Sequence, residues 1–156
     1  MSSKGMHFKR SKLDGVINFP KPSTKHGLKQ FIGLVNYFRG HVRESSTLTA
    51  PLEEMVKLYR AKEGLIWTEE TETVFNRVKE AVHECPRLWF VDENEKIYVH
   101  TDASNIGIGG YMFQVIDGEE KPIAFISKAY DQSMKKWCPY QKEGFGIYYS
   151  LKKWRH

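Results

Sequence analysis

Two acidic residues are candidates for chemistry because each lies where a carboxylate has no obvious packing role. Asp102 follows the run KIYVHT, which is rich in β-branched and aromatic residues, and precedes the glycine-rich run GIGGYMFQVI. Glu143 is the single acidic residue between Asp131 and the C-terminus, in a segment rich in basic and aromatic residues. A carboxylate at a strand end and another near a helix start can converge on Mg²⁺, which takes oxygen ligands and retains several waters.

Each carboxylate also has an ordinary structural explanation. Small residues follow Asp102, so an Asx turn between two strands accounts for it. Glu143 falls in the first turn of an expected helix, where the helix dipole favours a solvated glutamate. Gly144 and Gly146 beside it cost a helix roughly 1 kcal/mol each relative to alanine, and they let another backbone or a substrate approach closely. The residue pattern by itself leaves both explanations open.

The elements that position these carboxylates are predicted from hydrophobic periodicity. KIYVHT and GIGGYMFQVI are typical of strands, and PIAFIS is typical of a third. Asp117 and Gly118 follow the second run, and this dipeptide favours a tight hairpin turn because it tolerates positive φ. A helix is predicted from about Pro139 to the end of the chain. We therefore expect a three-stranded antiparallel sheet with one helix packed on it.

Three amphipathic helices are predicted before the sheet. Ser23 or Thr24 can cap the first, whose apolar residues recur at helical spacing. The second is predicted over TAPLEEMVKLY, with Pro51 in its first turn. The third, within WTEETETVFNRVKEAVHECP, begins after Thr68 and ends before Pro86. Helices followed by strands define the predicted fold class as α+β.

The positive charge is concentrated in the N-terminal part of the chain. Residues 1–60 hold 11 Lys and Arg against 4 Asp and Glu, whereas residues 61–156 hold 13 against 15. A basic segment favours a polyanionic partner such as nucleic acid, although a basic face is often only a solvated one. Lys25, Lys29 and Asn36 share a face of the first predicted helix that its apolar residues leave free. Phosphate contacts on that face would carry no base specificity.

Length and composition exclude several classes of protein. The 156 residues, 40% of them hydrophobic, suffice for one ordinary domain or two small ones. No apolar run is long enough to cross a membrane, and the N-terminus MSSKGMHFKR has no apolar stretch typical of a secretion signal. Cys85 and Cys138 lack the spacing of a metal knuckle, so we expect reduced thiols in an intracellular protein, in the cytoplasm or the nucleus.

Three stretches, in order along the chain, resemble one family. FPKPSTKHGLKQFIGLVNYFRGHV is similar to the reverse transcriptase thumb of Ty3/gypsy-type retrotransposons, with its F-P-x-P start and its F-x-G-L-x-N-Y-x-R helix. LIWTEETETVFNRVKEAVHECPRLWF resembles the connecting helix of that family. TDASNIGIGGYMFQ, KPIAFISKA and KEGFGIYYSLKKWRH resemble the first half of its RNase H domain. The resemblance covers almost the whole chain.

The resemblance implies a domain organisation and a partner. Residues 1–62 would be a reverse transcriptase thumb-like helical segment, 63–92 a connecting helix, and 93–156 a truncated RNase H-like domain. The implied fold is a small helical unit followed by a partial RNase H-like sheet of three antiparallel strands with one helix. The implied partner is a template–primer duplex or an RNA/DNA hybrid, and no membrane is implied.

The same resemblance assigns roles to individual residues. Asp102 matches the first metal-binding aspartate of the family, and Glu143 matches its second carboxylate. In the family, two Mg²⁺ ions about 3.5–4 Å apart support the hydrolysis of RNA in a hybrid. The carboxylates hold the metals rather than attack the RNA. The residues implied to contact nucleic acid are Lys25, Lys29, Asn36 and Arg39.

The resemblance also implies that the catalytic machinery is incomplete. The third and fourth carboxylates of the family lie beyond the helix that holds Glu143, and the paired aspartates of its polymerase lie before Met1. We therefore expect a fragment of a protein with RNA-directed DNA polymerase and ribonuclease H activity, inactive alone. The alternative is a non-catalytic nucleic-acid-binding or protein-interaction module from a decayed or domesticated element. An intact polymerase motif upstream and a strand-borne aspartate downstream would favour the first, whereas stop codons on both sides would leave only the second or no function.

An open sheet edge is a further expectation from the resemblance. In the family, the strand that bears Asp102 pairs with the next strand and with the strand that follows the Glu143 helix. Without that second partner, residues 97–101 would expose unpaired N–H and C=O groups, which can pair with another chain. Self-association through this edge is expected, and the helices are expected to fold better than the sheet.

Overall fold

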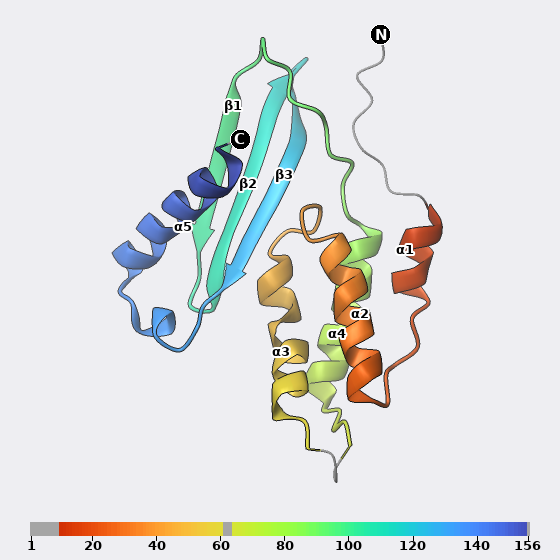
Figure 1. Cartoon of the computed structure of the whole chain (residues 1–156). Helices are drawn as coiled ribbons and strands as arrows, with labels where there is room; N and C mark the ends of the chain where they lie inside the picture. Colours follow the sequence, from red (N-terminus) through yellow and green to blue (C-terminus); the bar gives the residue numbers. More distant parts are fainter. Residues whose placement is uncertain (1–9, 61–63, 156) are drawn as a thin grey trace.

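The chain has the predicted α+β architecture, with helices, then a three-stranded antiparallel sheet, then a final helix (Figure 1). This computed structural model describes residues 10–60 and 64–155. The α-helices there are α1 Arg10–Ile17, α2 Lys25–Tyr37, α3 Ser45–Leu58, α4 Glu69–His83 and α5 Pro139–Trp154; the strands are β1 Ile97–Ala103, β2 Gly107–Ile116 and β3 Glu119–Ala129. A short 3₁₀ helix, Met134–Lys136, precedes α5. Across the described residues, no helix is long and apolar enough to span a membrane.

Helices α1–α4 form a helical unit around one hydrophobic core. α2 begins after Thr24, whose hydroxyl accepts a hydrogen bond of 3.1 Å from the backbone N–H of Gly27, so the predicted cap is confirmed. Phe31 on α2 packs between Phe19 and Phe75, with ring centroids 5.4 and 4.5 Å away. The buried residues of this core are Val16, Leu28, Phe31, Ile32, Val35, Phe38, Val42, Leu52, Phe75, Val78 and Val82.

The start of α3 differs from its sequence pattern. α3 begins at Ser45 rather than near Thr49, so Pro51 lies inside the helix and not in its first turn. Glu44 precedes the helix in the left-handed conformation, with φ 52°, which sets this earlier start. Proline in a helix removes one hydrogen bond, and the tertiary packing of the fully buried Leu52 compensates for that local cost.

The helix predicted as a connector, α4, shares the core of the helical unit. Thr68 and Thr71 cap its start reciprocally: each backbone N–H donates to the hydroxyl of the other residue, at 2.9 and 3.2 Å. Three residues on its inner face are buried in the core described above. The helix ends at His83, two residues before the predicted end at Cys85.

The sheet has the strand order β1-β2-β3, with both pairs antiparallel. Asp117 and Gly118 connect β2 to β3 with φ of 54° and 77°, so the predicted hairpin turn is confirmed. β3 lies on the side of the helical unit, where the N–H of Phe125 donates to the carbonyl of Gly40 at 3.0 Å. β1 lies at the other edge and pairs with β2 alone among the described strands.

The last helix, α5, lies across one face of β1 and β2 (Figure 1). A Cβ at Gly110 would lie 2.6 Å from both the Ile126 Cγ2 and the Ser150 Oγ, so only glycine allows α5 to lie this close to β2. The buried residues between the sheet and α5 form a second, smaller cluster: Ile108, Tyr130 and Met134.

Candidate nucleic-acid interface and carboxylate pair

The solvent-facing side of α2 holds three of the predicted nucleic-acid residues. Lys25, Lys29 and Asn36 are four and seven residues apart, which places them on one helical face. Lys29 and Asn36 are exposed, whereas Lys25 is half-buried. Gly33 lies between them, and a Cβ there would meet no atom within 4 Å. The backbone of α2 is therefore accessible at the centre of this basic face.

The cations of this region differ in how freely they can meet a ligand. Lys29 forms no hydrogen bond or ion pair with any other residue in 10–60 or 64–155. The Lys25 Nζ lies 5.2 Å from the centroid of the Tyr59 ring, a cation–π distance. The Lys12 Nζ donates to the Tyr37 hydroxyl at 2.9 Å, which adds a further ammonium group near the C-terminal end of α2.

The fourth predicted residue, Arg39, lies apart from this face. It follows the C-cap of α2, and its guanidinium is turned toward the sheet. The Nη2 atom donates to the Ser46 hydroxyl at 2.7 Å and to the backbone carbonyl of Ser127 at 3.3 Å. The structure therefore brings together the three residues of α2 and places Arg39 at the contact between the helical unit and β3.

Asp102 lies inside β1, one residue before the strand ends. It pairs with Gly109 of β2. Because side chains alternate along a strand, Thr101 and Ala103 point to α5 and Asp102 points to the opposite face. On that face the carboxylate borders a cavity of about 320 Å³. The other lining residues are Arg43, Glu44, His100, Thr101, Gly109, Gly110 and Tyr111.

Glu143 is exposed and lies in the second turn of its helix. α5 begins at Pro139, so its first turn contains no acidic residue, and the expected place of Glu143 in that turn is wrong. A Cβ at Gly146 would lie 4.0 Å from the Thr101 Cβ, whereas Ser150, one turn further, lies against Gly110. The N-terminal turns of α5 therefore lie near the end of β1 that holds Asp102.

The two carboxylates thus lie near one end of the sheet, Asp102 on β1 with its side chain away from α5, and Glu143 on α5 itself. No hydrogen bond or ion pair joins either of them to another residue of the described ranges. Tyr130 lies within electrostatic reach of Asp102, and its buried hydroxyl has no hydrogen-bond partner among the described residues. Burial raises the pKa of Tyr130, and the negative charge of Asp102 raises it further. The field of Asp102 therefore reaches into the small cluster beneath α5.

These donors do not complete a site for two metal ions. In the described part of the chain, no group of three or more His, Cys, Asp or Glu residues can hold a metal ion. Two Mg²⁺ ions about 4 Å apart repel each other strongly, and two carboxylates supply too few anions to offset that repulsion. Cys85 and Cys138 are free thiols. Burial raises the pKa of Cys85, which disfavours the thiolate needed for metal binding.

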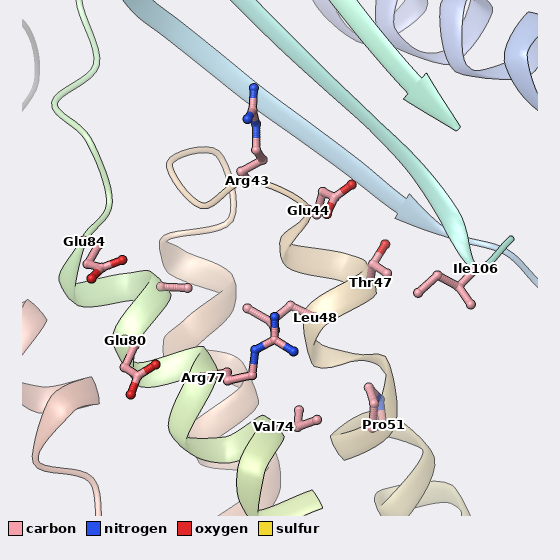
Figure 2. A pocket seen from close by; sticks show the side chains of 11 residues that line it. Arg43, Glu44, Thr47, Leu48, Pro51, Val74, Arg77, Glu80, Glu84 and Ile106 are labelled. Atoms are coloured by element: carbon pink, nitrogen blue, oxygen red, sulfur yellow. The ribbon is translucent and has the colours of Figure 1, made fainter. Parts of the chain in front are cut away.

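Several residues at this site escaped the sequence analysis. Arg43 and Glu44 border the cavity beside Asp102, and Figure 2 shows both on the segment that enters α3. Ser46 and Ser127, which meet Arg39, are 81 residues apart. No local pattern marks these residues, because their roles depend on the packing of the helical unit against the sheet.

The second half of the chain is an antiparallel sheet crossed by one helix, with an aspartate on its edge strand. Residues 67–156 match the family described as the RNase H-like domain found in reverse transcriptase, and the chain belongs to that family. The sequence is similar to the Transposon Tf2-3 and Tf2-4 polyproteins of Schizosaccharomyces pombe, at 30% identity over 158 residues. The match covers 100% of this chain and 12% of each polyprotein, so the chain spans about an eighth of the curated relatives it matches.

Solved structures of foamy viral protease-reverse transcriptase share the fold. The structure in complex with an RNA/DNA hybrid superposes with a TM-score of 0.80 at 24% identity, covering 96% of this chain and 20% of that one. A dRH form in complex with double-stranded DNA gives the same TM-score and identity, with 96% and 26% covered. The resemblance to the reverse transcriptase/RNase H family that the sequence indicated is thus confirmed, and so is the predicted fold class.

Proposed function

We propose that this chain is the part of a retrotransposon reverse transcriptase/ribonuclease H that holds a template–primer duplex or RNA/DNA hybrid against α2. The observation that carries the proposal is the exposed face of α2, where Lys25, Lys29 and Asn36 surround the open position of Gly33. In this proposal residues 1–62 act as the thumb-like segment, residues 63–92 connect, and residues 93–156 form the RNase H-like part.

The chemistry of this face suits a phosphate backbone. Lysine side chains neutralise phosphates and release counterions, which makes affinity steeply dependent on salt and independent of sequence. The missing side chain at Gly33 lets a sugar–phosphate strand approach the helix closely. The foamy viral proteins of the same fold were solved with a hybrid and with double-stranded DNA, which supports the same class of partner here.

Charge reversal tests the interface. Lys25→Glu with Lys29→Glu should weaken binding of both hybrid and duplex, and it should lower the slope of log K against log salt by about 0.9 for each phosphate that is no longer neutralised. The matched control is Lys135→Glu with Lys136→Glu, which changes net charge equally on the 3₁₀ helix before α5. Fluorescence anisotropy over a range of salt measures both quantities. Salt-insensitive binding, or equal weakening in the control, would refute the assignment.

Hydrolysis of RNA by this chain is expected to stay near background in Mg²⁺. Asp102 and Glu143 would be metal ligands in the parent enzyme, but the described residues do not complete a two-ion site. A labelled hybrid incubated with Mg²⁺ gives the measurement. Cleavage that Asp102→Asn abolishes would contradict this expectation and would require a carboxylate supplied by another chain.

A non-catalytic interaction module is the second candidate. It is favoured by the apolar surface of α5, where Ile147, Tyr148 and Leu151 are each more than half exposed. A module of this kind would retain full function in Asp102→Asn and Glu143→Gln variants. Loss of RNA hydrolysis in those variants, measured in the complete polyprotein, would instead favour the enzyme fragment.

A further inference from the structure

One cross-strand row of the sheet connects the helical unit to the candidate carboxylate. Ser127 of β3 pairs with Gly109 of β2, and Gly109 pairs with Asp102 of β1. Partners in adjacent strands point to the same face, so all three lie on the face opposite α5. Neighbouring strands are about 4.8 Å apart, which places Asp102 roughly 10 Å from Ser127 along this row.

A polar network holds the helical unit at one end of this row. The Arg39 Nη2 donates to the Ser46 hydroxyl and to the carbonyl of Ser127, as described above. The Ser46 hydroxyl donates to the same carbonyl at 3.1 Å. The backbone N–H of Ser46 donates to the Ser127 hydroxyl at 2.8 Å. Ser127 is 1% exposed, so this end of the network is shielded from water.

The middle of the row is held by close packing on glycine. The Glu44 Cγ lies 3.4 Å from where a Cβ at Gly109 would lie. Beside the row, a Cβ at Gly107 would lie 2.6 Å from the Lys128 carbonyl oxygen and 2.7 Å from the Thr47 Oγ1, which is too close for any other residue. Figure 2 shows Glu44 just before α3 and Thr47 in its first turn, both on the side of the strands. The start of α3 therefore packs directly against the backbone of β2.

We propose that Arg39 is a positioning residue: with Ser46 and Ser127 it fixes α2 relative to the row that ends at Asp102. This inference rests on the proposed function, because its consequence is that a nucleic acid bound to α2 lies in a set register with the carboxylate end of β1. Arg39 then affects binding through geometry and not through a phosphate contact. The guanidinium suits this task because its donors have a fixed planar arrangement.

Two variants separate positioning from a direct phosphate contact. Ser46→Ala with Ser127→Ala removes both hydroxyls of the network and changes no charge, whereas Arg39→Gln removes the guanidinium. Hydrogen exchange at the Phe125 amide, which bonds to Gly40 across the contact, reports the interface without nucleic acid. Hybrid binding over a range of salt reports phosphate contacts. Slow exchange in α2 and α4 confirms that each variant remains folded.

Positioning predicts that both variants accelerate exchange at Phe125 and lower hybrid affinity several-fold with an unchanged salt slope. The proposal is overturned if the serine variant binds as well as wild type, or if Arg39→Gln lowers the slope by about 0.9 with unchanged exchange, the signature of a phosphate contact. Lys29→Gln, which removes a proposed phosphate contact, shows how far the salt slope falls when such a contact is lost. If Lys29→Gln leaves the slope unchanged, the proposed function fails, while the exchange at Phe125 still decides whether Arg39 fixes the interface.

Discussion

The helical unit and the sheet differ in how completely each is packed. The core of α1–α4 contains eleven buried apolar residues in the described chain, whereas the cluster between the sheet and α5 contains three. On α5, the side chains of Ile147, Tyr148 and Leu151 remain 51, 57 and 56% exposed. Burial of apolar area is the main favourable term in folding, so most of the stability resides in the helical unit.

The two edges of the sheet differ in a related way. β3 lies against the helical unit, contains Pro122, and shows a register shift opposite Met112 and Phe113. β1 pairs without interruption from Ile97 to Ala103 and contains neither proline nor lysine. Proline, lysine, irregular register and coverage are the usual protections of an edge strand. Among the strands that the structure describes, the sheet therefore has one protected edge, β3, and one unpaired edge, β1.

The largest effect on stability is expected from removing the Phe31 ring at the centre of the helical core. Phe31→Ala should lower the free energy of unfolding by about 3–5 kcal/mol, because the cavity adds to the lost burial of a 0%-exposed side chain. Ile108→Ala, in the smaller cluster, should cost about 2 kcal/mol, the low end for such changes. Urea denaturation followed by circular dichroism measures both. A greater destabilisation by Ile108→Ala would reverse the comparison.

Hydrogen exchange should show the contrast residue by residue. Slowly exchanging amides are expected to concentrate before residue 86, because buried contacts set local stability and most of them lie there. Exchange read by mass spectrometry or NMR on the purified chain gives the map. Strong protection of a monomer throughout residues 97–127 would show that the sheet is stable without a further strand.

Adding a charge to β1 tests the comparison between the two edges of the sheet. Ile97→Lys should shift the chain from self-associated species toward monomer, because lysine on an edge strand opposes pairing with another chain. Ile97 is 50% exposed, so the substitution costs little burial. Val115→Lys, on the central strand at 39% exposure, is the matched control. Sedimentation velocity measures the distribution. A wild-type chain that is already monomeric at high concentration would contradict self-association through β1.

The smallest effect concerns pH and the segment that joins α2 to α3. Burial lowers the pKa of His41 below 6.5, so the unfolded chain binds this proton more readily than the folded chain. The contribution of His41 to stability is therefore constant above about pH 6.5 and declines as pH falls below that value. His41→Gln should show a shallower decline between about pH 6.5 and 5 in denaturation experiments. An identical decline in both proteins would exclude this role.

Sequence periodicity predicts the elements well where the local pattern and the tertiary packing agree. α2, α4 and the hairpin turn follow from Thr24, Thr68 and Asp117-Gly118, because caps and turns are decided within a few residues. α1 was not predicted, since its short segment becomes helical where Val16 packs into a core made by distant helices. The start of α3 was misplaced because Pro51 suggested a first turn.

The candidate site was harder to predict from the sequence than the fold. The sequence indicated the shared face of Lys25, Lys29 and Asn36, because helical spacing determines it. It did not indicate that Asp102 points away from the face of the sheet that α5 covers, since that depends on where α5 packs. Nor did it separate Arg39 from the residues of α2, because the partners of Arg39 lie in another part of the chain.

The sequence separation of the Arg39 contacts has a consequence for the order of folding. Arg39 meets Ser127 across 88 residues, whereas the caps of α2 and α4 form between residues three apart. Contacts that close long stretches of chain form late, after local structure has reduced the entropy of closure. The helical unit should therefore assemble first and the sheet should dock on it afterwards. Weakening the network would then accelerate the unfolding rate and leave the folding rate nearly unchanged.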